Sequence, residues 1–555
     1  MSLYDTICDE MKSSHTRILR LLLLLSFFIF AGIYVMHCAT RSLDPDLGWH
    51  LRMGEEIVET KDVPTVETWN TPIFGEQWID HEWLLNVGFF EIYHHFGFEG
   101  LAYTSVFLLL LLFGVQQYVL LKKKTSISAL VTILILQTFG LFGMSAHIGI
   151  RPIMLSLLLF FAFLRCFKKA ISGKHPVVFR IFLPLLFVFW ANLHGSFLIG
   201  YAVLFAWMVI FGMLSLFPTL AQFLGRFFGI PHSSARTQLS ILAVSFACLV
   251  APILNPYGVD LYHLLSDYWS DGYYMTHITE WLPAWAWPID FWKLFFSAFS
   301  LGFLLLWFLT IITNPLQKIP KPPLWETALF LLFLFLSLNH IRHFPLFFIT
   351  ALPLLFSFCV DFLPTQFSGK KTFSKTLTLG IPLMFSLVFL GTSAVQARGI
   401  SLPENPFSSE KFCKRYPCKA TEFLKYSEQN KATLLNPYVW GGYLLWVWQE
   451  KTIFIDGRQP QRSYEDHSFL EESNSFFDKE QIEEKLTKHH IEVVMLKKET
   501  PPSFSWFEKR FFGIGDEQEE EMKQSENVLL EFLKNSVDWK QVYEDDVAII
   551  FEKEK

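Results

Sequence analysis

The sequence has little charge and few cysteines for its length. Only 18% of its 555 residues are charged, the net charge is −6, and there are 7 cysteines. With 52% hydrophobic residues, such a chain is neither disordered nor typical of a soluble enzyme. Because Lys and Arg are not in excess, the sequence carries no basic footprint, and nucleic acid is set aside as a partner. No internal repeat or low-complexity segment is evident.

Long apolar segments dominate the first 400 or so residues. The first, Leu21–Met36, follows basic residues and precedes no small-residue cleavage signature, so we expect a retained anchor rather than a signal peptide. Crossing a hydrocarbon core of ~30 Å takes ~20 apolar residues. Segments near that length recur at 101–121, 126–144, 153–167, 178–193, 197–217, 238–254, 291–313, 325–340, 344–361 and 376–395. The sequence therefore predicts an α-helical polytopic membrane protein with about eleven transmembrane helices.

Basic residues alternate between the predicted loops. Cytoplasmic loops carry an excess of Lys and Arg. With residues 1–20 in the cytoplasm, the predicted inner loops hold most of these residues, including Lys122–Lys124, Lys168–Lys169, Lys318 and Lys370–Lys371. An odd number of spans then places the tail outside. We predict a membrane core over 21–396, with a large first external loop at 39–100, and an extracytoplasmic domain over 397–555.

The tail alternates apolar and polar segments. Apolar runs of β type occur at Thr452–Ile455, Ile491–Leu496 and Val547–Phe551, and polar helical stretches separate them. This pattern predicts a small α/β domain. Cys413 and Cys418 share the tail, so an oxidising compartment favours a disulfide between them; two free thiols are the alternative.

Acidic residues crowd both ends of the first external loop. Asp44 and Asp46 follow the first helix, where a carboxylate can act as a general base or hold a divalent cation against a phosphate. Alternatively, Asp44 merely caps a helix that starts near Leu47.

Four further side chains of this loop are titratable or bind phosphate well. They are His50, Arg52, His81 and Glu82. Each is a candidate for substrate binding, and each could equally be an interfacial residue satisfied by hydrogen bonds.

Three strings in this loop carry a resemblance to a known family. DPDLGWHLRMGEEI, VPTVETWN and WIDHEWL resemble a large group of mostly uncharacterised bacterial membrane proteins. That group is assigned to the GT-C superfamily of membrane glycosyltransferases. The similarity covers most of the chain, because it extends through Asn192–Gly195, Asn255–Gly258, Glu280–Trp281 and Arg342–Phe344.

The tail carries a second resemblance. Trp440–Trp446 and Ile453–Arg458 are similar to the acceptor-side signature of oligosaccharyltransferase catalytic subunits. Those enzymes have a Trp-Trp-Asp run whose carboxylate reads the acceptor peptide. This chain has Tyr438-Val439-Trp440-Gly441, without an acid, which argues against transfer to Asn sequons.

The resemblance implies a GT-C fold in a bacterial inner membrane and an inverting transfer from a polyprenyl-phosphate-linked sugar. The acceptor would be a glycan, a glycolipid or a protein. Asp46, or else Asp44, would be the general base. Arg151, Arg342 and His343, at predicted outer helix ends, are candidates for binding the departing phosphate, with interfacial snorkelling as the alternative.

Two more residues and a metal complete the expectations. His194, in a predicted outer turn, and Glu280, in the aromatic-rich loop 255–290, are further substrate-binding candidates. A helix-end histidine and an interfacial helix are the respective alternatives. A divalent metal, Mg²⁺ or Mn²⁺, held by Asp44 and Asp46 is left open. The competing classes are a membrane transporter and a non-catalytic scaffold or sensor on the same fold.

Overall fold

The computed structural model describes residues 3–122, 124, 126–172, 176–230, 235–264, 272–286, 291–313, 320–362, 375–498 and 528–554. Within them the chain forms two compact units, each built from three segments. Unit 1 comprises Met1–Arg41, Ala102–Pro252 and Glu280–Ser401. Unit 2 comprises Ser42–Leu101, Ile253–Thr279 and Leu402–Lys555. Of the predicted inner basic residues, Lys123, Lys318, Lys370 and Lys371 lie outside the described part of the chain.

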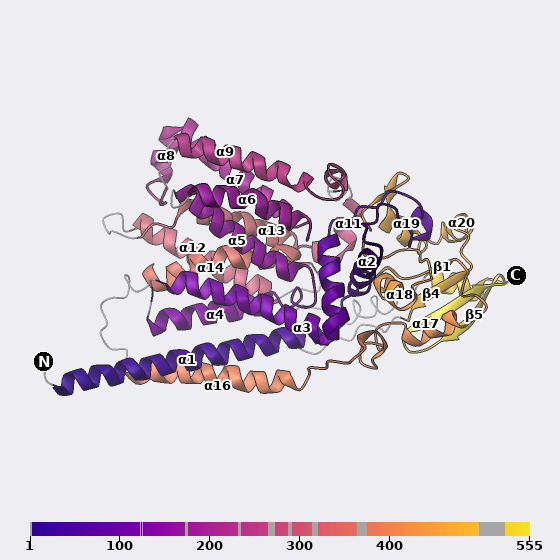
Figure 1. Cartoon of the computed structure of the whole chain (residues 1–555), viewed down its shortest axis with the longest axis horizontal. Helices are drawn as coiled ribbons and strands as arrows, with labels where there is room; N and C mark the ends of the chain where they lie inside the picture. The colour runs from indigo at the N-terminus through magenta and orange to yellow at the C-terminus, as the bar shows by residue number, and fades with distance from the viewer. Residues whose placement is uncertain are drawn as a thin grey trace. The chain divides into compact units, whose positions relative to one another are not determined.

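Unit 1 is a bundle of apolar helices (Figure 1). Its helices are α1 (Leu3–Arg41), the second part of α3 (Trp83–Leu121), α4 (Ile127–Gly143), α5 (Ile153–Ser172), α6 (Pro176–Ala191), α7 (Phe197–Leu216), α8 (Pro218–Leu224), α9 (Ala235–Val250), α12 (Phe291–Thr313), α13 (Leu324–Asn339), α14 (Phe344–Ser357) and α16 (Lys375–Ala397). Each apolar segment that the sequence predicts to span the membrane coincides with one of them. Among the described residues, 5 helices are long and apolar enough to cross a membrane, and the other apolar helices are shorter.

Aromatic side chains fill the interior of unit 1. α1 packs along α16, and α4 and α13 both pack against α14. α4 approaches α14 closely because two glycines make room for phenylalanine rings. A Cβ at Gly140 would lie 2.1 Å from the Phe348 ring, and one at Gly143 would lie 2.4 Å from the Phe344 ring. Both rings are fully buried, so this contact forms part of the core.

α3 is longer than one membrane crossing requires. Its 39 residues would extend for about 58 Å as a straight helix, about twice a hydrocarbon core. Gly97, with φ 62° and ψ −164°, interrupts the helix. The first segment of unit 2 ends shortly afterwards, at Leu101. Glycine suits this position because a side chain would strain a positive φ. The part after Gly97 matches the predicted span 101–121, and the part before it belongs to unit 2.

Unit 2 combines the loop that follows α1 with the segment 253–279 and the tail. From the loop come α2 (Leu47–Thr60), a short 3-10 turn η1 (Thr71–Ile73) and the first part of α3. The segment 253–279 contributes α11 (Gly272–His277). The tail contributes α17 (Cys418–Lys425), α18 (Gly441–Val447), α19 (Phe469–Ser475), α20 (Ile482–Lys488) and α23 (Val528–Asn535). Cys413 and Cys418 form a disulfide, which confirms the predicted pairing.

A four-stranded mixed sheet supports the tail. Its order is β1-β4-β6-β5, where β1 (Leu434–Leu435) runs parallel to β4 (Val493–Lys497) and the other pairs are antiparallel. β6 (Ala548–Lys553) lies between β4 and the edge strand β5 (Trp539–Glu544). β2 (Ser463–Tyr464) pairs with β3 (His467–Ser468) in a separate hairpin. The predicted α/β character of the tail is therefore confirmed.

One of the three predicted strands is wrong. Ile491–Leu496 and Val547–Phe551 correspond to β4 and β6, but Thr452–Ile455 joins neither sheet. Its apolar residues are buried, yet the backbone of Ile453 bridges to Asn70 of the first loop. Residues 452–455 were predicted as a strand because a buried loop segment can have the same apolar composition as a buried strand.

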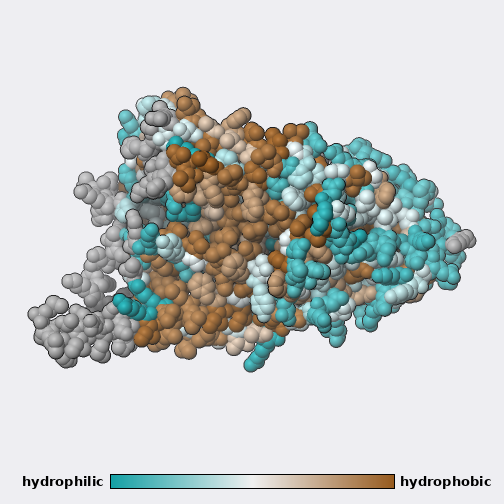
Figure 2. Space-filling model, in the orientation of Figure 1, coloured by the Kyte–Doolittle hydropathy of each residue, from teal (hydrophilic) through white to brown (hydrophobic). Residues whose placement is uncertain are grey.

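The two units differ in surface character. Figure 2 shows hydrophobic residues (brown) over the helices of unit 1 and hydrophilic residues (teal) over the tail. A helical bundle whose outside is apolar suits a lipid environment, because no water is present there to favour polar side chains. The structure thus supports a membrane protein with a polar, separately organised second unit.

Candidate active site

The two aspartates of the first loop lie in the turn that leads into α2. Asp44 Oδ1 accepts a hydrogen bond of 3.0 Å from the backbone N–H of Asp46. Asp46 occupies the N-cap position of α2, but its side chain does not cap the helix. Its Oδ1 accepts a 3.0 Å hydrogen bond from Trp49 Nε1 instead. The N-cap residue of α2 is therefore Asp46 rather than Asp44, whose side chain accepts the backbone N–H of Asp46.

α2 packs against α18 of the tail at a contact made by glycines. A Cβ at Gly48 would lie 2.0 Å from the carbonyl oxygen of Gly442, and a Cβ at Gly442 would lie 2.3 Å from the carbonyl oxygen of Pro45. The backbones touch because neither residue has a side chain. The DPDLGW string and the WGGYLLW string, almost 400 residues apart, thus form a single contact.

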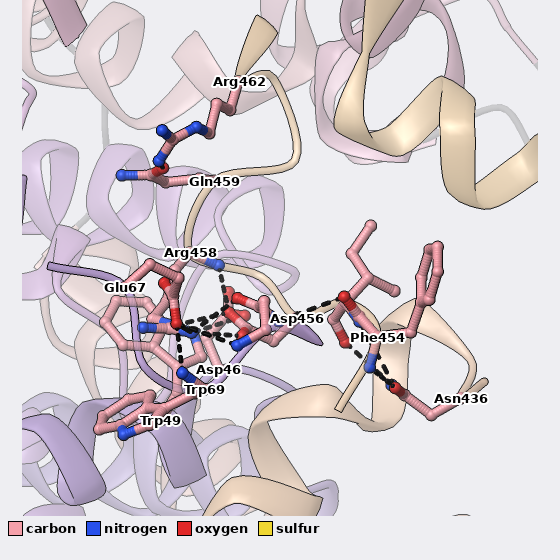
Figure 3. Close-up of polar contacts among 12 residues, drawn as sticks. Asp46, Trp49, Glu67, Trp69, Asn436, Phe454, Asp456, Arg458, Gln459 and Arg462 are labelled. Carbon is pink, nitrogen blue, oxygen red and sulfur yellow. Dashed lines mark hydrogen bonds and ion pairs between the residues drawn. The ribbon is translucent and has the colours of Figure 1, made fainter. Parts of the chain in front are cut away.

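Arg458 joins the loop and the tail within unit 2 (Figure 3). Its guanidinium donates to both carboxylate oxygens of Asp456, at 2.9 Å each, to Glu67 Oε1 at 3.0 Å and to Asn70 Oδ1 at 2.7 Å. Its Cζ also lies 4.3 Å and 4.6 Å from the ring centroids of Trp69 and Trp78, respectively. In the sequence, this arginine stood out only as the last residue of the Ile453–Arg458 motif.

Electrostatics keep Arg458 charged although it is buried. Burial by itself would lower its pKa, but the carboxylates of Asp456 and Glu67 raise the pKa above its ordinary value. Its side chain is only 2% exposed, and those of its two carboxylate partners are 1% or less exposed. A buried cation of this kind is stable only where its charge and its donors are matched. The cluster is therefore a structural clamp rather than a ligand site.

Asp80 of the WIDHEWL string belongs to a buried chain of polar side chains that also includes Asn86 and His50. His50 Nδ1 lies 2.6 Å from Asn86 Oδ1, and Asn86 Nδ2 donates to Asp80 Oδ2 at 2.8 Å. Burial lowers the pKa of His50, so its ring is neutral at pH 7, and burial raises the pKa of Asp80 to about 6. His81 lies 3.5 Å from Glu82.

His50 contacts the base candidate Asp46 indirectly, through Trp49, whereas the contact described for His81 is with Glu82. Burial would lower the pKa of His81, but its contact with Glu82 outweighs burial and raises it. The His50 ring lies against the Trp49 ring at 3.6 Å, and Trp49 in turn bonds Asp46. Arg52 instead pairs with Glu55 at 3.0 Å. The structure thus groups His50, His81 and Glu82, whereas Arg52 makes a separate contact.

Unit 1 brings four of the predicted residues together around Trp281. Arg151 pairs with Glu280 at 2.5 Å, Arg342 Cζ lies 4.2 Å from the centroid of Trp281, and the His343 ring centroid lies 5.9 Å from it. Burial would raise the pKa of Glu280, but Arg151 and other nearby cations lower it to about 2. The carboxylate therefore stays charged at every physiological pH.

A histidine that the sequence reasoning did not select lies in the same group. His147 is 4% exposed, and its Nε2 is buried without a hydrogen-bond partner among the described residues. Burial, and then the nearby Lys293, lower its pKa to about 3, so it is neutral. The sequence around His147 does not predict that it lies near Glu280 and Arg151, because only the packing of the helices brings these residues together.

His194 lies in the turn between α6 and α7, as predicted. Its Nδ1 lies 2.9 Å from Ser156 Oγ and 2.7 Å from Ser196 Oγ. Ser196 also donates its backbone N–H to the same nitrogen at 3.2 Å. These contacts fit the helix-end role that was the alternative to substrate binding.

The described residues hold no group of three or more His, Cys, Asp or Glu side chains placed to bind a metal ion. Mg²⁺ commonly binds through one or two carboxylates together with the phosphates of a substrate. Asp44 and Asp46 remain the residues that would hold such an ion, and no step below depends on it.

Comparisons with known proteins find similarity among solved structures but not among family models or curated proteins. No protein-family model matches the sequence, and no curated protein matches it. Among solved structures, the chain is similar to the oligosaccharyltransferase of Archaeoglobus fulgidus in its apo form, with 12% identity and a TM-score of 0.49. The alignment covers 85% of this chain and 69% of that one. At that TM-score the similarity carries no functional argument, so the function is argued from the residues alone.

Proposed function

We propose that the protein is a membrane glycosyltransferase that moves a sugar from a polyprenyl-phosphate-linked donor to an extracytoplasmic acceptor. The observation that carries this proposal is the Asp46 carboxylate, which Trp49 holds at the start of α2 instead of leaving it to cap the helix. The resemblance of the surrounding string to GT-C enzymes supplies the reaction class. The donor sugar and the choice among glycan, glycolipid and protein acceptors are not assigned.

The chemistry that we propose for Asp46 is general base catalysis. Its carboxylate accepts the proton of the acceptor hydroxyl as the hydroxyl oxygen attacks the anomeric carbon of the sugar. The bond between that carbon and the phosphate oxygen breaks, which inverts the anomeric configuration and releases a polyprenyl phosphate. General base catalysis typically contributes a factor of about 10²–10⁴ in rate. Asp44 is the alternative base, because its carboxylate lies in the same turn.

The leaving phosphate needs a cation, for which Arg342 is the strongest candidate. Arg151 already pairs with Glu280, whereas Arg342 forms no ion pair among the described residues. The contact of Arg342 with the Trp281 ring orients the guanidinium without neutralising it. A charge at a helix end beside lipid is costly, which favours a functional role for Arg342. His343 is a candidate donor, while Arg151 and Glu280 would support it.

The disulfide supports the proposed location of unit 2. Cys413 and Cys418 are bonded, and disulfides persist in oxidising compartments such as the bacterial periplasm or the cell exterior. This agrees with the orientation that the basic loops predict. We therefore propose a multi-pass protein of the bacterial inner membrane, with residues 1–20 in the cytoplasm and unit 2 outside.

The experiment that tests the function compares wild type with Asp46→Asn, Asp44→Asn and Asp62→Asn. Asp62 is an exposed acid of the same loop, so its variant controls for a general change of charge. We expect native mass spectrometry of wild type to show a bound polyprenyl-phosphate sugar. Asp46→Asn should keep that lipid and reduce its turnover at least about 100-fold, and Asp62→Asn should transfer normally.

Other outcomes would redirect the assignment. Normal turnover in Asp46→Asn together with loss in Asp44→Asn would move the base to Asp44. If wild type neither carries nor consumes any polyprenyl-phosphate sugar that is supplied, the transferase proposal is wrong, and the transporter and scaffold classes replace it.

A further inference from the structure

Gly457 of the tail lies directly against the Asp46 carboxylate. A Cβ built on Gly457 would be 1.9 Å from Asp46 Oδ1, 3.0 Å from Asp46 Cγ and 3.3 Å from Trp49 Nε1. The same oxygen accepts the hydrogen bond from Trp49. The space that Gly457 leaves by having no side chain is therefore occupied by the hydrogen-bonded pair of Asp46 and Trp49.

The backbone on the Gly457 side of this contact is held on both flanks. Asp456, the preceding residue, bonds Arg458 through both of its carboxylate oxygens, and Asp456 Oδ1 also accepts the backbone N–H of Arg458 at 2.8 Å. Upstream, Asn436 bonds the backbone of Phe454 and Ile455 at 2.9 Å each. The segment 453–458 is thus fixed by buried hydrogen bonds and cannot retreat without breaking them.

The backbone on the Asp46 side is held as well. Gly48 and Gly442 bring α2 and α18 into backbone contact, and Gly442 also abuts the carbonyl oxygen of Pro45, the residue before Asp46. With both backbones fixed, a methyl group at position 457 meets two side chains, and the Asp46 carboxylate at 1.9 Å is much closer than Trp49 Nε1 at 3.3 Å. A side chain there would displace the carboxylate rather than the chain that carries it.

We infer that Gly457 is a positioning residue for Asp46: by lacking a side chain, it sets where the carboxylate sits and allows the Trp49 hydrogen bond. This inference rests on the proposed function, because it assigns Gly457 a part in placing the general base. It also makes the segment 453–458 of the tail part of the catalytic apparatus. A carboxylate moved by about 1 Å can cost a factor of about 10² in rate.

The test compares Gly457→Ala with Gly88→Ala in the full-length protein. Gly88 lies in the first part of α3, also in unit 2, and a Cβ there would meet nothing within 4 Å. We expect Gly457→Ala to lower kcat by about 10-fold to 100-fold and to leave KM for the lipid-linked donor within about 2-fold. Gly88→Ala should retain wild-type kcat and KM. A merely structural role would instead lower the melting temperature and the fraction of active protein, without this split.

A second variant decides the matter if Gly457→Ala does not fold. Trp49→Phe keeps an aromatic ring at this position and removes the donor to Asp46 Oδ1, together with part of the buried ring volume. A folded Trp49→Phe protein with reduced kcat and unchanged KM supports the inference, and one with normal kcat overturns it. Normal kcat in a folded Gly457→Ala protein also overturns it.

The same series separates this inference from the function on which it rests. If wild type transfers sugar and Asp46→Asn does not, the function stands whatever Gly457→Ala does. If wild type transfers nothing, the proposed function fails first, and the positioning role fails with it.

Discussion

Replacing Arg458 with methionine tests whether one buried cation holds the first loop and the tail segment together. The side chain is 2% exposed and donates to Asp456, Glu67 and Asn70. Its guanidinium carbon lies within 4.6 Å of the centroids of two tryptophan rings. Methionine has a similar length and is apolar, so Arg458→Met keeps most of the packing and removes the charge. The two carboxylates then remain buried without their cation.

The expected loss of stability follows from those unpaired carboxylates. Removing one partner of a buried ion pair typically costs about 3–5 kcal/mol, because the remaining charge is left desolvated. Without Arg458, Glu67 Oε1 keeps only the backbone N–H groups of Trp69 and Asn70, which do not balance its charge, and Glu67 Oε2 has no hydrogen-bond partner among the described residues. For a unit of 150–250 residues, each kcal/mol shifts the melting temperature by about 2–4 °C. We therefore expect unit 2 of Arg458→Met to melt about 6–20 °C lower than wild type.

The measurement is thermal unfolding of the full-length protein in detergent, followed by proteolysis of unit 2 at each temperature. The matched control is Arg462→Met, four residues away. Arg462 pairs with Glu76 at 2.6 Å, but that carboxylate is 49% exposed, and exposed pairs contribute at most about 1 kcal/mol. Equal melting shifts in the two variants would refute the idea that burial makes Arg458 important.

A compensated variant locates the cause of the loss. Adding Glu67→Gln and Asp456→Asn to Arg458→Met removes the buried negative charges that the cation had balanced. If uncompensated charge is the cause, the triple variant should melt closer to wild type than Arg458→Met does. A triple variant that melts still lower would show that the hydrogen bonds, and not the charges, carry the stability.

Two further predictions concern the tail. Glu472 has a side-chain exposure of 0% and pairs with Lys485, Lys488, His467 and His489. Although burial opposes its charge, these partners lower its pKa below the ordinary value of 4.5, so its stabilisation is present above about pH 4.5 and is lost as pH falls below that value. The melting temperature of wild type should therefore fall between about pH 5 and pH 3, and that of Glu472→Gln should be lower at pH 7 and flatter across the same range; parallel curves would contradict this. Thiol labelling of unreduced protein under denaturing conditions should leave Cys413 and Cys418 unmodified, and labelling of both after reduction completes the check.

Helices and strands were predictable where periodicity and length decide them. Every apolar segment predicted to span the membrane is a helix, because runs of that length can satisfy their backbone only internally in lipid. The predicted strands at 491–496 and 547–551 are correct for a similar reason, since buried strands are rich in β-branched and aromatic residues. β5 was missed because it is an edge strand in which only one of six residues is buried.

Four candidate residues could be selected from the sequence, but the contacts among them could not be predicted. The sequence selected Arg151, Glu280, Arg342 and His343 one by one, and the structure assembles them around Trp281. The sequence did not indicate His147, which lies in the loop between α4 and α5 and interacts electrostatically with Glu280, Arg151 and Arg342. Periodicity describes one helix at a time, whereas this group depends on which helix ends meet.

The contact between the Asp46 turn, α18 and Gly457 could not be predicted from any one sequence motif, because glycines make it. Gly48, Gly442 and Gly457 act through the side chains that they lack, and a missing side chain has no hydrophobic period and no charge to detect. Each makes sense only beside its partner: Gly48 beside Gly442, and Gly457 beside Asp46. The strings DPDLGWHLR, WGGYLLW and IDGR are thus three parts of one packed contact, although a change in polarity near residue 397 separates the first from the other two. A substitution in any of the three strings should therefore be interpreted by its effect on the Asp46 turn before it is attributed to its own neighbourhood.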